Sequence, residues 1–310
     1  MIPHQPEEGL LKGLRKIFKP KRKEERDEFQ KKLHATKFQN LNLAEFTRIQ
    51  DSNYSAGWST SLGKLRSQNQ DAILAVSTTI KSGSLDRFIG IFAVADGMGG
   101  HRDGDLASQI AIQAFLSNTL PELTTHSEVQ ASRPDTDRVK EILQTGTLAA
   151  HRQVSEEVPG GGTTFTAAVI IGDQVVITHT GDSRAYFVNE KSELKLLTRD
   201  HSVVNRMIEL GRITEKQAAE HPRRNVLYRA LGQAEFNQPD ISVHSISNSK
   251  YLLLCSDGLW GVLSENKISE IINSTLTPQL ACLKMVEETN KAGGPDNIST
   301  ILVRFPGFQK

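Results

Sequence analysis

The chain has 310 residues, of which 37% are hydrophobic and 24% are charged. This composition excludes a largely disordered protein, and without an apolar run near 18 residues it excludes a membrane-spanning one. The net charge of +1 argues against a nucleic-acid-binding protein. Two cysteines cannot build a disulfide framework, and the first residues lack the pattern of a signal peptide, so we expect a cytoplasmic location.

Charge is divided unevenly along the chain. Residues 1–50 contain 12 basic and 7 acidic residues, which leaves 25 basic and 29 acidic residues for 51–310. The first segment is therefore a basic N-terminal arm with a net charge of +5, and the remainder is mildly acidic at −4. We predict a domain boundary near residues 51–57, where the composition changes.

The arm contains one amphipathic pattern. Leu10, Leu14, Ile17 and Phe18 fall on one face of a predicted helix, and basic side chains cover much of the rest before Pro20. A basic amphipathic helix suits an anionic membrane surface or an acidic partner. Three interpretations stay open: a solvated tail or a helix docked on the chain's own acidic surface, peripheral membrane contact through residues 10–23, and a protein partner.

Beyond the arm, strand patterns and helix patterns alternate. Gly172 and Asp173 separate two apolar runs and predict a hairpin turn, which implies antiparallel pairing. Helix pairs around such hairpins favour an α+β sandwich. Short apolar runs predict strands at 71–77, 88–95, 163–171, 174–180, 184–188, 194–197, 251–255 and 298–305. Apolar spacing predicts a helix at 105–120, and Asp135 could cap a second one at 135–157. Two further helices are predicted at about 264–275 and 278–292.

Five aspartates stand at the ends of these strands: Asp71, Asp96, Asp182, Asp257 and Asp296. Neighbouring strands bring their ends together, so these carboxylates can converge. Carboxylates gathered at a core edge repel one another and lose hydration, and they therefore need a cation. An all-oxygen ligand set favours Mg²⁺ or Mn²⁺ over zinc. The alternative is that each Asp-Gly pair is an ordinary turn.

Arg66 stands five residues before Asp71 and could supply a phosphate ligand, because the arginine fork binds phosphate in a bidentate manner. The surrounding segment does not match a nucleotide-binding P-loop: Gly57 and Gly63 are too far apart, and Lys64 is followed by leucine.

Six motifs in this order resemble the metal-dependent Ser/Thr protein phosphatases, the PPM or type 2C family. They cover about residues 53–305 and comprise Arg66–Asp71, Val94–His101, Gly161–Thr164, Gly181–Ala185, Ser256–Trp260 and Gly293–Asn297. The segment that follows Leu197 resembles the bacterial branch. The resemblance implies two packed antiparallel β-sheets flanked by helices on both sides, with a flap subdomain at about 200–232 beside the active site, and a catalytic domain over 51–310.

The resemblance also implies roles for individual residues. Asp96 corresponds to the carboxylate that bridges two metal ions, and the carbonyl of Gly97 helps hold one of them. Asp257 and Asp296 correspond to the other direct ligands. Asp71 corresponds to the residue that hydrogen-bonds metal-bound water, and Arg66 to the phosphate-binding arginine. Two Mn²⁺ or Mg²⁺ ions would activate a shared water that attacks phosphoserine or phosphothreonine directly, with no covalent phosphoenzyme.

The sequence departs from the family pattern at three places. Gln70 stands where many members have glutamate. Met98 stands where animal members carry a histidine proposed as general acid, and His101 is nearby. Gly261 occupies a position where an aspartate often helps bind a third metal, so with Asp182 alone this third site should be weak.

The leading hypothesis is an active phosphatase of phosphorylated proteins, expected to be a monomer and to act on the products of a Ser/Thr kinase. One alternative is a hydrolase of small phosphorylated molecules. The other is a regulatory pseudophosphatase that binds phosphoproteins, against which the presence of Arg66, Asp96, Asp257 and Asp296 argues.

Deletion of residues 1–50 should leave hydrolysis of p-nitrophenyl phosphate largely intact, because the catalytic motifs all lie beyond the arm. Sedimentation of the full chain with anionic liposomes tests the membrane interpretation: pelleting should occur at low salt and fade as salt screens the charge. Loss of basal activity in the deletion variant would show that the arm belongs to the catalytic fold.

Overall fold

The computed structural model describes residues 54–82, 85–99, 103–124, 135–236 and 238–307. All of them belong to one compact unit. The predicted arm and its amphipathic helix lie outside the described residues, as does His101. Within the described part of the chain, no helix combines the length and the apolar character needed to cross a membrane.

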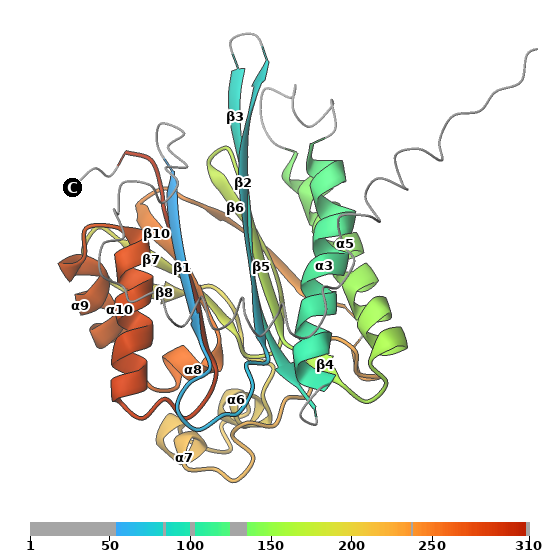
Figure 1. Ribbon diagram of the computed structural model, residues 1–310, viewed down its shortest axis with the longest axis vertical. Coiled ribbons are helices and arrows are strands. Elements are labelled where there is room, and N and C mark those ends of the chain that lie inside the picture. Colours follow the sequence, from blue (N-terminus) through green and yellow to red (C-terminus); the bar gives the residue numbers. More distant parts are fainter. Residues whose placement is uncertain (1–53, 83–84, 100–102, 125–134, 237, 308–310) are drawn as a thin grey trace, which may run out of the picture. The chain divides into compact units, whose positions relative to one another are not determined.

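Two sheets form the centre of this unit, and every strand pair in them is antiparallel (Figure 1). The first sheet has the order β1-β11-β10-β7-β8 and the second β2-β3-β5-β6-β9, with β4 paired to β3. The strands are β1 (Ser55–Ser61), β2 (Asp71–Ser82), β3 (Leu85–Met98), β4 (Gly162–Thr163), β5 (Phe165–Ile171), β6 (Gln174–Thr180), β7 (Arg184–Asn189), β8 (Leu194–Leu196), β9 (Asp240–Ser245), β10 (Ser249–Cys255) and β11 (Ile298–Arg304).

Helices cover the outer face of each sheet. In Figure 1, α3 (Asp103–Leu123) and α5 (Thr136–Glu157) lie beside the second sheet, and α9 (Glu265–Ser274) and α10 (Pro278–Lys291) lie beside the first. The short α8 (Asp257–Trp260) follows β10 directly. The prediction of an α+β sandwich with helices on both sides is therefore confirmed.

The alternation of side chains along β3 explains why the strands read as continuous apolar runs. Ile91 and Ala93 point toward α3 and α5, whereas Phe92 and Val94 point between the sheets. All four are buried, because a strand covered on both faces has no solvent-exposed side. The same two-sided burial extends to β5 and to most of β6, which places the centre of the second sheet in the core.

The helix start predicted from the capping residue Asp135 is also found. Asp135 accepts hydrogen bonds from the backbone N–H groups of Asp137 and Arg138, and Thr277 caps α10 in the same way. In α3, which covers the predicted helix 105–120, the buried face runs through Ile110 and Ala114, whereas Leu106 is 46% exposed.

Several short elements escaped prediction. The strands β1 and β9 form edges of their sheets and have few fully buried side chains, so their apolar pattern is weak. The predicted strand 163–171 divides at Thr164 into β4 and β5. Two helices, α6 (Val203–Glu209) and α7 (Glu215–Ala219), lie in the segment predicted as the flap, at the same end of the sandwich as α8 (Figure 1).

Candidate active site

The two sheets bring their aspartates to one end of the sandwich. Asp71 opens β2 and is the register partner of Asp96 on β3. Ser256, at the end of β10 in the other sheet, donates from its hydroxyl to Asp71 Oδ2 over 2.8 Å. Because Asp257 follows Ser256, this bond places a carboxylate of the first sheet beside the pair on the second. The predicted convergence of Asp71, Asp96 and Asp257 is therefore found in the structure.

Asn297 holds the loop that carries Arg66 against the loop that carries Asp296. Its side-chain oxygen accepts from the backbone of Gln70, and its amide donates to two carbonyls, those of Leu62 and Gln68. Close packing reinforces the contact: a Cβ at Gly63, where φ is +79°, would lie 2.2 Å from the carbonyl oxygen of Asp296. The two loops therefore form one rim of the site.

Arg66 lies on this rim with its side chain 47% exposed. Its Nη2 donates to Asp296 Oδ2 over 2.6 Å. An arginine has five N–H donors, so this single bond leaves others for an anion. The structure thus brings Arg66 and Asp296 together at the edge of the cluster, where both side chains are accessible to solvent.

Asp182 is buried in a turn that is fixed from several sides. Gly181 adopts φ +107°, and a Cβ there would meet the Thr164 side chain at 2.6 Å. Thr164 accepts a hydrogen bond from the backbone of Asp96 and exchanges one with the hydroxyl of Ser183. Thr164 therefore ties the Asp182 turn to the strand that carries Asp96.

The carboxylates of the cluster influence one another strongly. Burial raises the pKa of Asp71 to about 7, with repulsion from Asp257 and Asp296 adding to it and hydrogen bonds from Ser299 and Ser256 offsetting part. Burial and repulsion from Asp296 raise the pKa of Asp257 to about 6. The pKa values of Asp96 and Asp182 are also raised, first by burial and then by neighbouring carboxylates. All five aspartates therefore act in one electrostatic field.

This field, and the atoms without partners, fit a divalent cation. Asp71 Oδ1 and Asp257 Oδ1 are buried without a hydrogen-bond partner. Within the described residues, no group of three or more His, Cys, Asp or Glu side chains is arranged closely enough to hold a metal ion. The oxygen donors and their excess negative charge suit Mg²⁺ or Mn²⁺, and rotation of the carboxylates would be needed to close a ligand set around such an ion.

Gly97 occupies a position where no side chain fits. A Cβ there would lie 1.9 Å from the carbonyl oxygen of Gly104. Its N–H donates to the carbonyl of Gln70, and it pairs with Thr163 of β4. The side-chain amide nitrogen of Gln70 is buried without a hydrogen-bond partner. Next to Gly97, the sulfur of Met98 accepts a hydrogen bond from Gln233 Nε2.

A hollow of about 640 Å³ lies next to this end of β3. Its walls come from the end of the flap and from the loop before β4: Gly160, Gly161, Leu227, Tyr228, Gly232, Gln233, Ala234 and Glu235. Since β4 pairs with Gly97 and Met98 on one side and bridges to Leu231 on the other, it lies between the end of β3 and the segment that borders the hollow.

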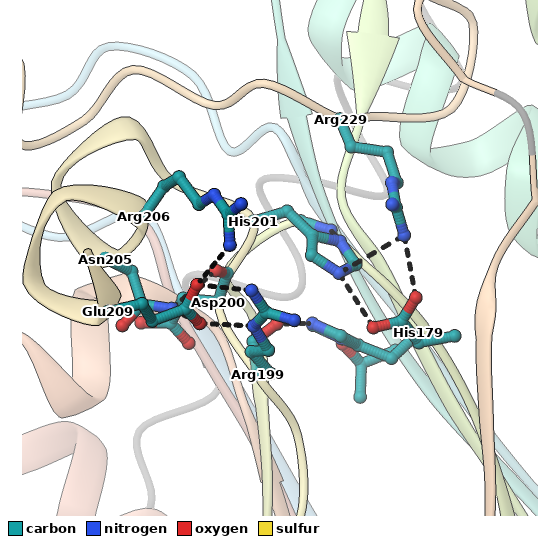
Figure 2. Close-up of polar contacts among 11 residues, drawn as sticks. His179, Arg199, Asp200, His201, Asn205, Arg206, Glu209 and Arg229 are labelled. Atoms are coloured by element: carbon teal, nitrogen blue, oxygen red, sulfur yellow. Dashed lines mark hydrogen bonds and ion pairs between the residues drawn. The ribbon is translucent and has the colours of Figure 1, made fainter.

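The start of the flap is held by a network of polar contacts (Figure 2). Glu209 of α6 accepts from both Arg199 and Arg206, and Asn205 donates to the carbonyl of Asp200. On the other side of the network, His201 donates from Nε2 to Asp240, which also accepts from Arg229 near the flap's end. Both ends of the flap are thereby fastened to the sandwich.

Four residues that hold the site lie within the six motifs, but the sequence alone predicted no role for them. They are Thr164, Ser256, Trp260 and Asn297. Each acts by a hydrogen bond to a residue distant in the sequence, so no local pattern announces its role. Their position inside the six ordered motifs was the only available signal.

Comparison with known proteins agrees with this geometry. A family model described as Protein phosphatase 2C matches residues 56–298. The chain is 38% identical over 223 residues to the serine/threonine phosphatase stp of Listeria monocytogenes, covering 71% of this chain and 86% of that protein. The solved serine/threonine phosphatase of S. agalactiae superposes with a TM-score of 0.67 at 30% identity, covering 81% of this chain and 99% of that one. The catalytic domain of PstP, solved in complex with two manganese ions, has a TM-score of 0.64 at 26% identity, with coverage of 81% and 98%.

The raised carboxylate pKa values predict how the stability of the metal-free protein depends on pH. A group whose folded pKa exceeds its unfolded value near 4 stabilises the fold below that value and loses this contribution as pH rises through the folded pKa. For Asp71 and Asp257 the loss should begin as pH rises past about 4 and be complete near the folded values of about 7 and about 6. In chelator, the Tm of the wild type should therefore fall relative to Asp71→Asn between about pH 4 and about pH 7.

Thermal unfolding followed by dye fluorescence measures both proteins across this range. Saturating Mn²⁺ should abolish the relative fall, because a cation neutralises the same repulsion. Parallel Tm curves for wild type and Asp71→Asn in chelator would contradict the proposed repulsion.

Proposed function

Because the chain belongs to the protein phosphatase 2C family and is a serine/threonine phosphoprotein phosphatase, we propose that Asp96, Asp257 and Asp296 hold divalent metal ions at the end of the sandwich. The observation that carries this proposal is the convergence of the carboxylates, with two buried oxygens lacking partners. The relative PstP binds manganese, and Mn²⁺ or Mg²⁺ is the ion we propose here, with two ions in the main site and a weak third one beside Asp182.

The chain's own groups have distinct roles in this proposal. The carbonyl of Gly97 supports the metal site, since the strand there approaches its neighbours too closely for any side chain. Arg66 binds the phosphoryl group with the guanidinium nitrogens that Asp296 leaves free. Divalent cations in the site would lower the pKa of water and offset the charge of the phosphoryl oxygens.

Asp71 offers one free acceptor. Ser256 fixes its Oδ2, which leaves Oδ1 buried without a hydrogen-bond partner. Its pKa is raised to about 7 in the metal-free protein, and bound cations would lower that pKa, so the group would be an ionised acceptor in the loaded site. We therefore assign Asp71 Oδ1 as the atom that accepts a hydrogen bond or a proton from water.

Phosphorylated proteins are the substrates that this surface suits best. The hollow beside Met98 can accept side chains that flank a phosphorylated residue, and the flap that borders it carries exposed charges, among them Arg223 and Arg224. An intact set of carboxylates argues against a pseudophosphatase, and the open rim argues against a site reserved for small phosphorylated molecules. We further propose that these substrates are the products of a Ser/Thr kinase in the cytoplasm, and that the phosphatase acts as a monomer. Residues 10–23 offer a peripheral contact with membrane or protein.

Asp96→Asn should reduce kcat on a phosphothreonine peptide by more than about 100-fold, because it removes a formal charge from the metal site while keeping the side chain's shape. Steady-state kinetics and calorimetric titration with Mn²⁺ measure the effect, and metal affinity should fall in parallel. Asp173→Asn, in the turn between β5 and β6, is the matched control and should behave as wild type. Turnover near the wild-type value in Asp96→Asn would refute the metal site.

Arg66→Ala should lower kcat/KM for a phosphopeptide roughly ten- to a hundredfold, since a charge-assisted contact contributes about 1.5–3 kcal/mol. Affinity for Mn²⁺ should change little. Arg138→Ala is a fitting control, because the Arg138 side chain on α5 is 45% exposed and also bonded to carboxylates. If Arg66→Ala and Arg138→Ala gave the same kcat/KM, Arg66 would be an ordinary surface residue.

A further inference from the structure

Arg184, the first residue of β7, binds the first residue of the flap. Its Nε donates to Asp200 Oδ1 over 3.0 Å and its Nη2 to Asp200 Oδ2 over 2.7 Å, while Nη1 donates to the hydroxyl of Tyr186. The side chain of Arg184 is 21% exposed and that of Asp200 only 8%. This parallel, bidentate pair fixes the plane of the guanidinium group.

The fixed guanidinium lies over the indole ring of Trp260. Its central carbon is 3.6 Å from the centre of the indole ring. The indole N–H in turn donates to the backbone carbonyl of Asp182 over 3.0 Å. Trp260 is also the last residue of α8, the helix that begins at Asp257. A chain of contacts therefore leads from the start of the flap to the backbone of Asp182 and, along α8, to Asp257.

His201 provides a second connection to the same turn. Its backbone N–H donates to the carbonyl of Gly181 over 2.7 Å, and Gly181 N–H donates to His201 Nδ1 over 3.1 Å. Since Nδ1 accepts, the ring proton is on Nε2, from which it is donated to Asp240 Oδ2 over 3.1 Å. Asp200 and His201 thus hold the turn of residues 181–184 from two sides.

Stability alone does not explain a buried ion pair at this place. The desolvation of two charges offsets most of their attraction, and well-packed apolar residues often serve stability as well or better. What the pair provides is orientation, because the arginine fork is rigid and planar, whereas lysine is a flexible point charge.

We propose that Arg184 is a positioning residue: held by Asp200, it presses on Trp260 and so fixes the Asp182 carbonyl and the end of α8 relative to the flap. The start of the flap and the Asp182 turn then form one rigid body, and any movement of the flap is confined to residues beyond Ser202, where α6 begins. This inference rests on the carboxylate site proposed above.

The kinetic test compares Arg184→Lys, Asp200→Asn and the double variant. Each single variant should lower kcat on a phosphopeptide about tenfold or more and leave KM within about twofold, as expected when a residue that orients the site is lost. The double variant should be no worse than either single one, because both break the same unit. Arg199→Lys is the matched control, because it weakens another arginine–carboxylate ion pair, the one with Glu209. The Arg199 side chain is 52% exposed, so this variant should keep wild-type kcat.

A spectroscopic test does not depend on turnover. The sequence has two tryptophans, so Trp58→Phe leaves Trp260 as the only source of indole emission. In that background, Arg184→Lys and Asp200→Asn should shift the emission to longer wavelength, because the indole ring of Trp260 becomes more exposed to solvent. Arg199→Lys should not shift it. These spectra are recorded in chelator, well below the Tm of each variant.

The outcomes separate the two proposals. A wild type that does not require Mn²⁺ or Mg²⁺ would refute the metal site, whatever the spectra show. A metal-dependent wild type whose kcat is unchanged by both Arg184→Lys and Asp200→Asn would overturn the positioning role, and a lower Tm with unchanged kcat would do the same by assigning the pair to stability alone. Loss of kcat together with the shifted emission, absent in Arg199→Lys, supports it.

Discussion

The repulsion among carboxylates at one end of the sandwich is the interaction on which the rest of the structure depends. Asp71 and Asp96 are neighbours across one sheet, and Asp257 is brought to them from the other. Such a group is stable only if the surrounding fold is firm enough to hold it and a cation is available to neutralise it. The tightly packed layers meet the first condition. The second makes the cation part of the protein's stability as well as of its chemistry, since whatever relieves the repulsion also stabilises the fold.

The firmness comes from contacts that cross between the sheets at this end. Ser256 links β10 to β2, Thr164 links the Asp182 turn to β3, and Asn297 joins two loops into one rim. All three are short, neutral side chains whose hydrogen-bonding groups are largely used by other parts of the protein. A neutral donor or acceptor positions a carboxylate without adding charge to a site that already has too much. This explains why the supporting residues are Ser, Thr and Asn, and why the positive groups, Arg66 and Arg184, lie at its edges.

The sequence predicts those parts of the structure whose signal is local. Buried strands such as β5 appear as apolar runs, capped helices such as α5 announce their first residues, and the six ordered motifs identify the aspartates and the family. Edge strands such as β9 were missed because half-exposed strands need few apolar side chains. The contacts of Trp260 with Arg184 and with the carbonyl of Asp182 join residues more than 70 positions apart. Such pairings cannot be predicted from one sequence, because residue type alone does not tell whether an arginine is exposed or buried, or which distant residue it contacts.

The two arginines of the site, Arg66 and Arg184, differ in exposure and in the number of their partners. Arg66 is about half exposed and has a single bond to a carboxylate, Asp296, that it shares with the rim. Its charge can therefore turn toward an incoming phosphate at little cost. Arg184 is largely buried, bound to both oxygens of Asp200, bonded to Tyr186 and stacked on Trp260. To release it would leave Asp200 as an unpaired buried charge, which is strongly unfavourable. Exposure and the number of partners, rather than residue type, thus separate the arginine proposed to bind the substrate from the one proposed to position the site.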